Sequence, residues 1–353
     1  MKLYPKVSTI FIIWALAISA IFFFGFSNFP HSGKFSNNFW ENLANWDGGH
    51  YLGIAREGYK EKFQYAFFPL YPLAIKATNQ IIQNFLVSAI LISVSSAFLG
   101  LHLLYKLVAM DFDKKVARYT IFLLLIFPTS FYFLTAYSEG LFFLLAVATF
   151  FFLRKGNLGL AVILAALASA TRLVGLAVVL GLILEVWTTR GINKTNWYIF
   201  LAPLGFIIYC WYLFNTTGDP FYFMTAQLHW QRSLALPIIG FWETLRNLAT
   251  PGFITQNFSA FLDLIFAVFG VGMIIRAFRF LPIAYGVYGL VSVLLPLFTP
   301  SLSSVPRFLL PVFPIFILMA LVKNQNIIYA YKIISLMLLS AYSILFISGY
   351  WVS

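Results

Sequence analysis

Charged side chains are scarce in this sequence, and acidic ones are the scarcest. Charged residues make up 10% of the chain, with 11 Asp and Glu against 23 Lys and Arg. A soluble domain carries about 25% charged residues. This shortage, together with a hydrophobic content of 61%, excludes an ordinary soluble protein and predicts an integral membrane protein.

Cysteine is almost absent, because Cys210 is the only one in the chain. A single cysteine cannot form a disulfide within the chain, and it cannot build a cysteine-based zinc site. No internal repeat or low-complexity segment is visible either.

Apolar runs of membrane-spanning length fill the rest of the sequence, since a hydrocarbon core of about 30 Å takes roughly 20 helical residues to cross. They predict an all-α polytopic membrane protein with about eleven transmembrane helices. The expected helices are 7–26, 84–107, 119–137, 139–153, 157–171, 173–188, 197–214, 257–275, 281–298, 307–322 and 327–350. We treat 1–353 as a single integral membrane domain, with a motif-bearing catalytic half, 1–215, and a variable membrane half, 216–353.

The first apolar run, Val7 to Phe26, follows Lys2 and Lys6 as the core of a signal peptide would. It is too long for such a core and ends without small residues at a cleavage site, so we expect a retained first helix.

Lys and Arg collect in alternate connections, and cytoplasmic loops are enriched in these residues. This pattern predicts a multi-pass protein of the cell membrane with a cytoplasmic amino terminus. Two long loops, about 27–83 and 215–256, then lie on the external face. The net charge of +12 is explained by this topology and by attraction to anionic lipid headgroups, without a nucleic-acid partner.

The stretch NWDGGHYLGIAREGY, Asn45 to Tyr59, concentrates polar residues in the first of these loops. Asp47 stands where a helix N-cap is expected and Gly58 where a C-terminal glycine is expected, which predicts a short external helix at the membrane surface. Asp47, His50 and Tyr51 share one face of that helix at positions i, i+3 and i+4. The alternative is that Asp47 only caps the helix and Trp46 only anchors it at the interface.

Three further polar residues, Glu139, Arg172 and Arg307, fall at the expected outer ends of helices. Tyr137 and Ser138 precede Glu139 in an outer turn. Each arginine could extend to the interface or pair with Glu139. A pair of guanidinium groups is equally suited to a lipid-linked phosphate, which such groups bind through two hydrogen bonds.

These residues also carry a resemblance to a known family. The order along the chain is Trp46-Asp47, His50, Ile54-Ala55, Gly58-Tyr59, Phe67-Phe68-Pro69, Pro72, Tyr137-Ser138-Glu139, Thr171-Arg172 and Gly175, with a looser match at Arg307-Phe308 and Pro311. The combination resembles the glycosylphosphatidylinositol mannosyltransferase 2 family, PIG-V-like membrane glycosyltransferases of the GT-C fold. The sequence departs from the family pattern at Leu173 and Val174, where polar residues are expected.

The resemblance implies an enzyme that uses a polyprenyl-phosphate sugar, usually dolichyl-phosphate mannose in eukaryotes, on the external or luminal side. In that family an acidic residue of the first large external loop is catalytic, and the matching position here is Asp47. We expect inverting single displacement onto a glycan or glycolipid acceptor, with Asp47 as general base. Arg172 and Arg307 are expected to bind the donor phosphate.

The remaining candidate residues are expected to contact substrate; they are Trp46, His50, Tyr51, Tyr137, Ser138 and Glu139. No cofactor is expected. No metal site is expected either, because the only Asp-x-Asp, Asp111 to Asp113, falls in a connection predicted to be a solvated turn inside the cell.

Two other functions stay open at this point. Glu185 and Asp263 lie in apolar runs, and such residues can mark the pathway of a lipid or sugar transporter or flippase. A non-catalytic scaffold is the other possibility. The resemblance implies mannose as the sugar, but the sequence itself leaves another hexose or a pentose open, together with the acceptor and the oligomeric state.

Overall fold

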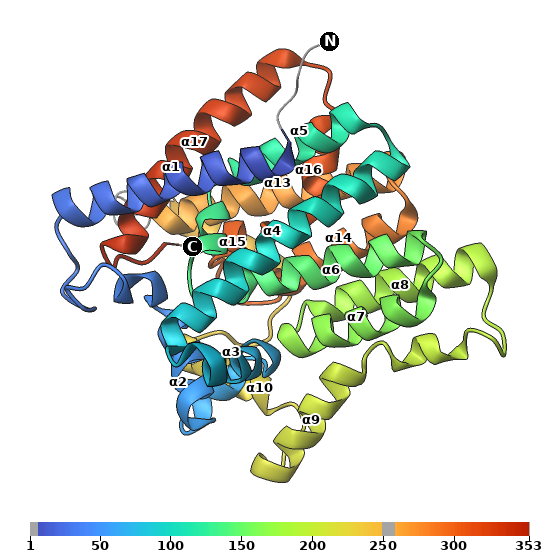
Figure 1. Cartoon of the computed structure of the whole chain (residues 1–353), viewed down its shortest axis with the longest axis horizontal. Coiled ribbons are helices and arrows are strands. Elements are labelled where there is room, and N and C mark those ends of the chain that lie inside the picture. Colours follow the sequence, from blue (N-terminus) through green and yellow to red (C-terminus); the bar gives the residue numbers. More distant parts are fainter. Residues whose placement is uncertain (1–5, 249–257, 353) are drawn as a thin grey trace.

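The computed structural model describes residues 6–248 and 258–352, and this part of the chain is helical without strands (Figure 1). The all-α class is therefore confirmed. Five helical segments are long and apolar enough to cross a membrane: α1 (Val7–Asn28), α4 (Phe85–Asp111), Trp197–Thr217, which joins η4 (Trp197–Leu201) to α9 (Leu204–Thr217), α13 (Phe258–Phe280) and α17 (Gln325–Ile347).

The other helices are shorter. In the first half they are η1 (Glu41–Ala44), α2 (Asp47–Glu57), η2 (Lys62–Ala66), α3 (Leu70–Ile82), α5 (Lys114–Leu125), η3 (Ser130–Leu134), α6 (Glu139–Arg154), α7 (Leu158–Thr171) and α8 (Gly175–Arg190). In the second half they are α10 (Tyr222–Ala226), η5 (Gln227–Trp230), α11 (Pro237–Leu248), α14 (Ile283–Leu294), η6 (Leu295–Leu297), α15 (Val305–Leu309) and α16 (Phe313–Ala320).

Two of the expected membrane helices are broken, so the predictions of continuous helices over 119–137 and 307–322 are wrong. The first ends at Leu125 and is followed by the 3₁₀ turn η3, with Pro128 between them. The second is divided into α15 and α16 around Pro311 and Pro314. Proline lacks the N–H that a continuous helix needs, which explains both interruptions. The structure does not confirm the count of eleven.

Helix α4 crosses the centre of the view in Figure 1 and packs against α5 and α6, while α1 and α17 pack against each other. From α6 the packing continues through α7, α8, α14 and α13. Glycines allow two of these contacts: a Cβ on Gly140 would lie 2.4 Å from the Ser93 carbonyl oxygen, and one on Gly175 would lie 2.2 Å from the Ala168 carbonyl oxygen. Both glycines are close to candidate site residues.

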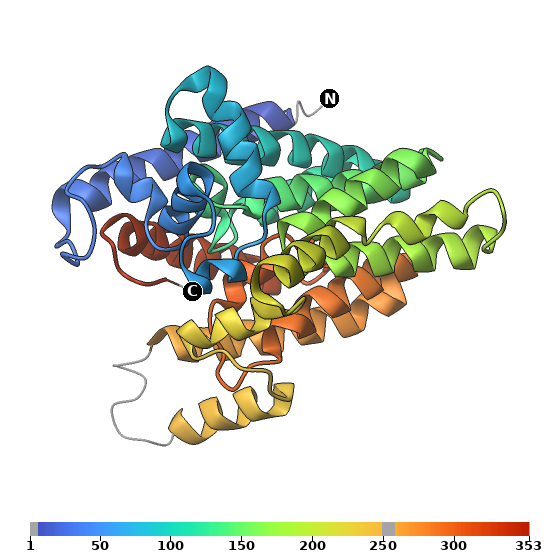
Figure 2. The same ribbon diagram turned by 90° about the horizontal axis from the view of Figure 1, so that it is seen from below.

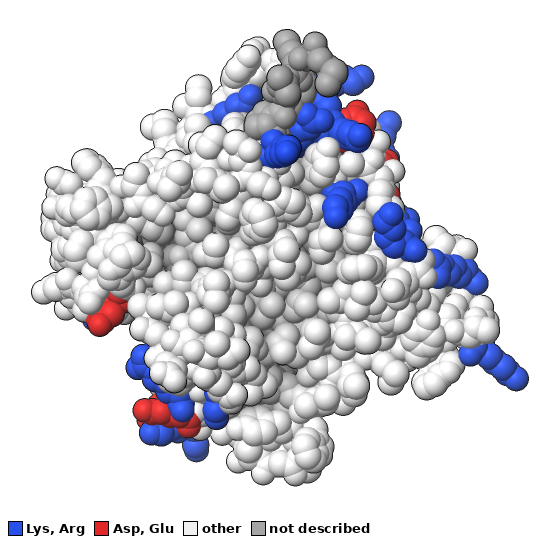
Figure 3. Space-filling model, viewed as in Figure 1, with Lys and Arg blue, Asp and Glu red and all other residues white. Residues whose placement is uncertain are grey.

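Charged side chains gather at two rims of the visible face, and a broad uncharged belt separates them (Figure 3). An uncharged belt and five helical segments long and apolar enough to cross a membrane are both features of a multi-pass membrane protein. The rim nearer the start of α1 is almost entirely Lys and Arg, whereas the other rim mixes both signs (Figures 1 and 3).

Asp111 is not in a solvated turn, contrary to the prediction for Asp111 to Asp113. Arg154 Nε lies 3.3 Å from Asp111 Oδ1, and Arg154 Nη1 lies 2.5 Å from Glu185 Oε1. Tyr285 donates a hydrogen bond of 2.5 Å to the other Asp111 oxygen. This cluster joins α4, α6, α8 and α14, because a carboxylate in apolar surroundings needs a partner. Asp113 is exposed and caps α5.

The two expected external loops are folded against each other. Helices α2 and α3 pack together and against α4, and α10 and η5 of the second loop pack against η2 of the first. Helix α11 lies at the periphery of the molecule (Figure 2). The two loops therefore form one layer, which covers one end of the bundle.

The topology predicts that this layer and the Lys- and Arg-rich rim lie on opposite sides of the membrane. We expect Asn38→Cys, in a Cys210→Ser background, to react with an impermeant maleimide added to intact cells. Lys115→Cys should react only after the cells are opened, because both positions are exposed but at opposite ends of the bundle. Labelling of position 115 but not position 38 in intact cells would reverse the orientation.

Candidate active site

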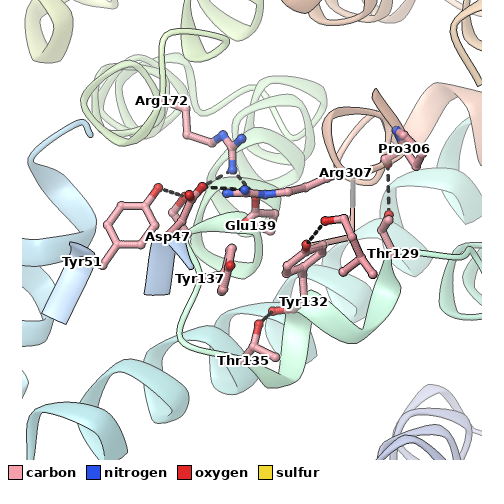
Figure 4. A network of polar contacts seen from close by, with 12 residues as sticks. Asp47, Tyr51, Thr129, Tyr132, Thr135, Tyr137, Glu139, Arg172, Pro306 and Arg307 are labelled. Carbon is pink, nitrogen blue, oxygen red and sulfur yellow. Dashed lines mark hydrogen bonds and ion pairs between the residues drawn. The ribbon is translucent and has the colours of Figure 1, made fainter. Parts of the chain in front are cut away.

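A buried carboxylate lies at the centre of the polar cluster. The Glu139 side chain is 0% exposed and accepts hydrogen bonds from both Arg172 and Arg307; the distance from Arg307 Nε to Glu139 Oε1 is 2.5 Å. Arg307 Nη1 also donates to Asp47 Oδ2 at 2.6 Å. Four residues that are far apart in the sequence are thus linked by ion pairs (Figure 4).

Helix ends place Glu139 and Arg172. Glu139 is the first residue of α6, where a negative charge is favoured by the helix dipole. Gly140 lets the start of α6 approach the backbone of Ser93 closely. Arg172 has an extended backbone at the end of α7, and the close packing of Gly175 on Ala168 keeps the turn into α8 tight.

Arg307 is fixed by the backbone around it. Asp263 accepts a hydrogen bond of 2.7 Å from the Val305 N–H, and Thr129 donates one of 3.0 Å to the Pro306 carbonyl. The guanidinium lies over the rings of Tyr137 and Tyr132, 4.7 Å and 5.2 Å from their centroids. Such cation–π contacts, together with the ion pairs, orient the side chain in one position.

Asp47 is the first residue of α2 and not its cap, so the N-cap prediction is wrong. The cap position is Trp46, at a positive φ of 58°, and no side chain caps the helix. The Asp47 carboxylate turns toward Arg307 instead, because an ion pair with a buried guanidinium outweighs a capping hydrogen bond. Gly58 ends the helix at a φ of 78°, as predicted.

The carboxyl-terminal segment holds Trp46. Its Nε1 donates to the Tyr350 carbonyl at 3.2 Å, and its ring meets the Trp351 ring edge-on at 5.0 Å. These contacts give Trp46 a structural role within the protein, beyond any contact with lipid.

Asp47, His50 and Tyr51 share a face of α2, as predicted, and all three line one cavity. Tyr51 is hydrogen-bonded to Ser138 at 2.9 Å, and burial raises the pKa of Tyr51 to about 12, so the phenol is neutral at physiological pH. Burial lowers the pKa of His50; Asp47 opposes this effect and His229 adds to it.

The cavity has a volume of about 860 Å³ and is lined by both external loops and by the chain around Arg307. Asp47, Arg172 and Arg307 lie in its wall, and the Asp47 side chain remains 21% exposed. Aromatic residues form another part of the wall; they include Phe67, Phe68, Phe223, Trp230, Phe308 and Trp351.

Tyr137, Ser138 and Glu139 are buried and are not among the lining residues. Tyr137 donates to the Asn45 carbonyl at 2.8 Å, next to α2, and Ser138 accepts from Arg172 at 3.3 Å. In this structure the three residues lie behind the residues that line the cavity and support them through hydrogen bonds and ion pairs. Their direct contact with a substrate stays a prediction, as does the binding of phosphate by Arg172 and Arg307.

The segment QLHWQRS, residues 227–233, lines the cavity and is missing from the sequence-based candidates. It contributes Gln227, His229, Trp230, Gln231 and Arg232. The detectable signal is its combination of aromatic, basic and amide side chains within an external loop. That signal does not say which residues face the site, because the segment has no regular periodicity.

The fold and the site define a multi-pass membrane protein with a mostly apolar, partly aromatic cavity beside a cluster of carboxylates and guanidinium groups. Residues 19–193 match the family model described as Mannosyltransferase (PIG-V). Through this segment, just under half of the chain, the protein is similar to the PIG-V mannosyltransferase family, as the resemblance predicted.

The chain is also similar to individual proteins. GPI alpha-1,6-mannosyltransferase 2 from Homo sapiens is 31% identical over 145 residues, which cover 38% of this chain and 29% of the human protein. ArnT from Cupriavidus metallidurans bound to undecaprenyl phosphate has 15% identity and a TM-score of 0.48, with 94% and 63% of the two chains covered. An oligosaccharyltransferase from Archaeoglobus fulgidus has 15% identity and a TM-score of 0.49, with 98% and 53% covered.

Glu139 should dominate the stability of the cluster. Glu139→Gln removes the carboxylate that both arginines share and leaves two buried guanidinium groups close together. Removal of one partner from a buried ion pair typically costs about 3–5 kcal/mol. We expect a loss of that order in unfolding experiments in detergent. Glu57→Gln, which breaks an exposed pair with Lys60, is the control and should leave the midpoint unchanged.

His50 should make stability depend on pH. Because its pKa is lower in the folded protein than the ordinary value of about 6.5, the unfolded chain binds a proton first as the pH falls. The contribution of the neutral His50 side chain to the free energy of unfolding is therefore complete above about pH 6.5 and is lost as the pH falls below that value. His50→Gln should therefore flatten the change in melting temperature between about pH 5.5 and 7.5. His31→Gln, outside the cavity, is the control; identical profiles for wild type and His50→Gln would contradict the assignment.

Proposed function

We propose that the protein is a membrane glycosyltransferase that transfers mannose from a polyprenyl-phosphate donor to a hydroxyl of a lipid-linked or cell-surface glycan on the external face. One observation carries this proposal: the Asp47 carboxylate lies in the cavity wall, oriented by Arg307 and next to Arg172. The match of residues 19–193 to the mannosyltransferase family model supports the reaction class.

The proposed reaction is a single displacement at the anomeric carbon. The acceptor oxygen forms a bond to that carbon while the bond from the carbon to the phosphate oxygen breaks. Asp47 takes the acceptor proton, and the polyprenyl phosphate leaves with the bonding electron pair. The products are the glycosylated acceptor and a polyprenyl phosphate, and a β-linked donor gives an α-linked product.

The leaving group is a stable anion, so the reaction needs no general acid. Negative charge develops on the phosphate oxygen, and guanidinium groups fixed before the reaction stabilise it without reorganisation. Arg172 and Arg307 already have fixed positions through Glu139. The neutral Tyr51 phenol and Ser138 hold the face of α2 that carries Asp47.

The aromatic part of the wall suits a sugar ring. The His50 ring lies 5.2 Å from that of Phe67 and 6.1 Å from that of Trp230, and His229 stacks on Phe63 at 4.4 Å. Apolar ring faces with a few polar groups among them are typical of small-molecule sites. We assign this part of the cavity to the sugar and the acceptor.

Glu185 and Asp263, the two residues that could mark a transport pathway, contribute to the packing of the helices instead. Glu185 pairs with Arg154, and Asp263 accepts a hydrogen bond from the backbone of Val305. Both side chains therefore have structural partners. The position of the Lys- and Arg-rich rim supports an external location for the cavity, because cytoplasmic ends of membrane helices are enriched in these residues.

Asp47→Asn tests the proposal. The amide keeps the size of the side chain but cannot accept the proton, and a positioned general base is typically worth about 10²–10⁴ in rate. Transfer of radiolabelled mannose from polyprenyl-phosphate mannose to a panel of glycolipids, by purified protein in detergent, should fall by that factor while donor binding survives. Asp113→Asn is the matched control, because Asn caps a helix as well as Asp does. Full transfer by Asp47→Asn would remove Asp47 from the reaction.

A further inference from the structure

A third guanidinium lines the cavity, and it differs from the other two. Arg232 belongs to the second external loop, and its Nη2 donates a hydrogen bond of 3.2 Å to the Ser303 carbonyl. Among residues 6–248 and 258–352 it forms no ion pair with a carboxylate, whereas Arg172 and Arg307 both do. The Arg232 Nε atom is buried and has no hydrogen-bond partner in the same part of the chain.

Phe308 is in contact with both Arg232 and Arg172. The central carbon of each guanidinium is 5.4 Å from the centroid of the Phe308 ring. One aromatic ring thus holds two cations on the same cavity wall. Burial lowers the pKa of Arg232; the charges of Asp47 and Asp263 oppose this effect, and those of Arg307 and Arg172 add to it. No carboxylate of the described residues lies within ion-pair distance of Arg232.

The ion pairs of the site leave one guanidinium out. Asp47 and Glu139 pair with Arg172 and Arg307, whereas Arg232 has no ion pair in the part of the chain that the structure describes. Since a guanidinium remains charged at every physiological pH, Arg232 adds a positive charge to the cavity wall that no ion pair compensates. A phosphodiester, the form of phosphate in a polyprenyl-phosphate sugar, carries one negative charge and would neutralise it.

We propose that Arg232 is the principal contact of the phosphate group of a polyprenyl-phosphate ligand, and that Arg172 and Arg307 chiefly orient Glu139 and Asp47. The proposal rests on the proposed function for the identity of the lipid. The unpaired Nε gives Arg232 a donor that needs an acceptor, and an arginine can bind phosphate through two parallel hydrogen bonds. Phe308 keeps the guanidinium of Arg232 in place before the ligand arrives.

Binding of farnesyl phosphate, a short polyprenyl phosphate, to the purified full-length protein tests this assignment, with farnesol as the ligand without phosphate. Arg232→Gln should weaken binding of farnesyl phosphate by roughly 10- to 100-fold, as the loss of hydrogen bonds to a charged group implies. Binding of farnesol should not change. Arg246→Gln, an exposed arginine of the same loop outside the cavity, is the matched control and should bind like the wild type.

Stability without ligand separates Arg232 from the other two arginines. Arg232→Gln removes a charge that has no carboxylate partner, so its unfolding midpoint should equal or exceed that of the wild type. Arg172→Gln should lower the midpoint, because it takes a partner from the buried Glu139. A lower midpoint for Arg232→Gln as well would show a structural role and overturn the proposal.

The binding outcomes also separate this proposal from the proposed function. Wild-type affinity of Arg232→Gln for farnesyl phosphate, with weakened binding by Arg172→Gln, would overturn the role of Arg232 and leave the lipid donor in place. If the wild-type protein binds farnesyl phosphate no better than farnesol, both the donor class and the role of Arg232 are overturned.

Discussion

The shared ion pair of Glu139 with Arg172 and Arg307 is the interaction on which the site depends. A buried carboxylate loses its hydration, and this loss is expensive unless charges and hydrogen bonds replace the water. Two guanidinium groups replace it here, and one of them continues to Asp47. The three helices that carry these residues, α6, α15 and α2, are held together through this contact, as is the turn between α7 and α8.

The apolar surroundings strengthen these ion pairs, since charges interact more strongly where water is excluded. The same surroundings explain why polar groups appear in satisfied clusters. Arg154 joins Asp111, Glu185 and Tyr285 at the other end of the bundle, and Asp263 is satisfied by the backbone of Val305. One feature of the Glu139 end matters for function: a cavity of about 860 Å³ opens beside this cluster, and it contains Arg232, which has no carboxylate partner among the residues that the structure describes.

The sequence predicted much of this arrangement, because long apolar runs and isolated charges leave strong local signals. The all-α class, the short helix from Asp47 to Gly58 and the shared face of Asp47, His50 and Tyr51 were all predictable. The pairing of Asp47 with Arg307, 260 positions away, was not, and it changed the role of Asp47 from cap to ion-pair partner. Arg232 was missed for a similar reason, since its environment comes from segments far along the chain, around Arg172 and Phe308.

The geometry also couples the two charge changes of the proposed reaction. When Asp47 accepts the acceptor proton, its negative charge disappears and Arg307 loses half of its compensation. At the same moment the leaving phosphate changes from a diester with one negative charge to a monoester that carries nearly two. The positive charge released at Arg307 and the negative charge gained by the phosphate arise in one low-dielectric cavity, where their attraction is strong. In the proposed reaction Arg307 thus orients the carboxylate before the transfer, its positive charge adds to that of Arg232 in attracting the phosphate after it, and the net charge of the filled cavity stays the same.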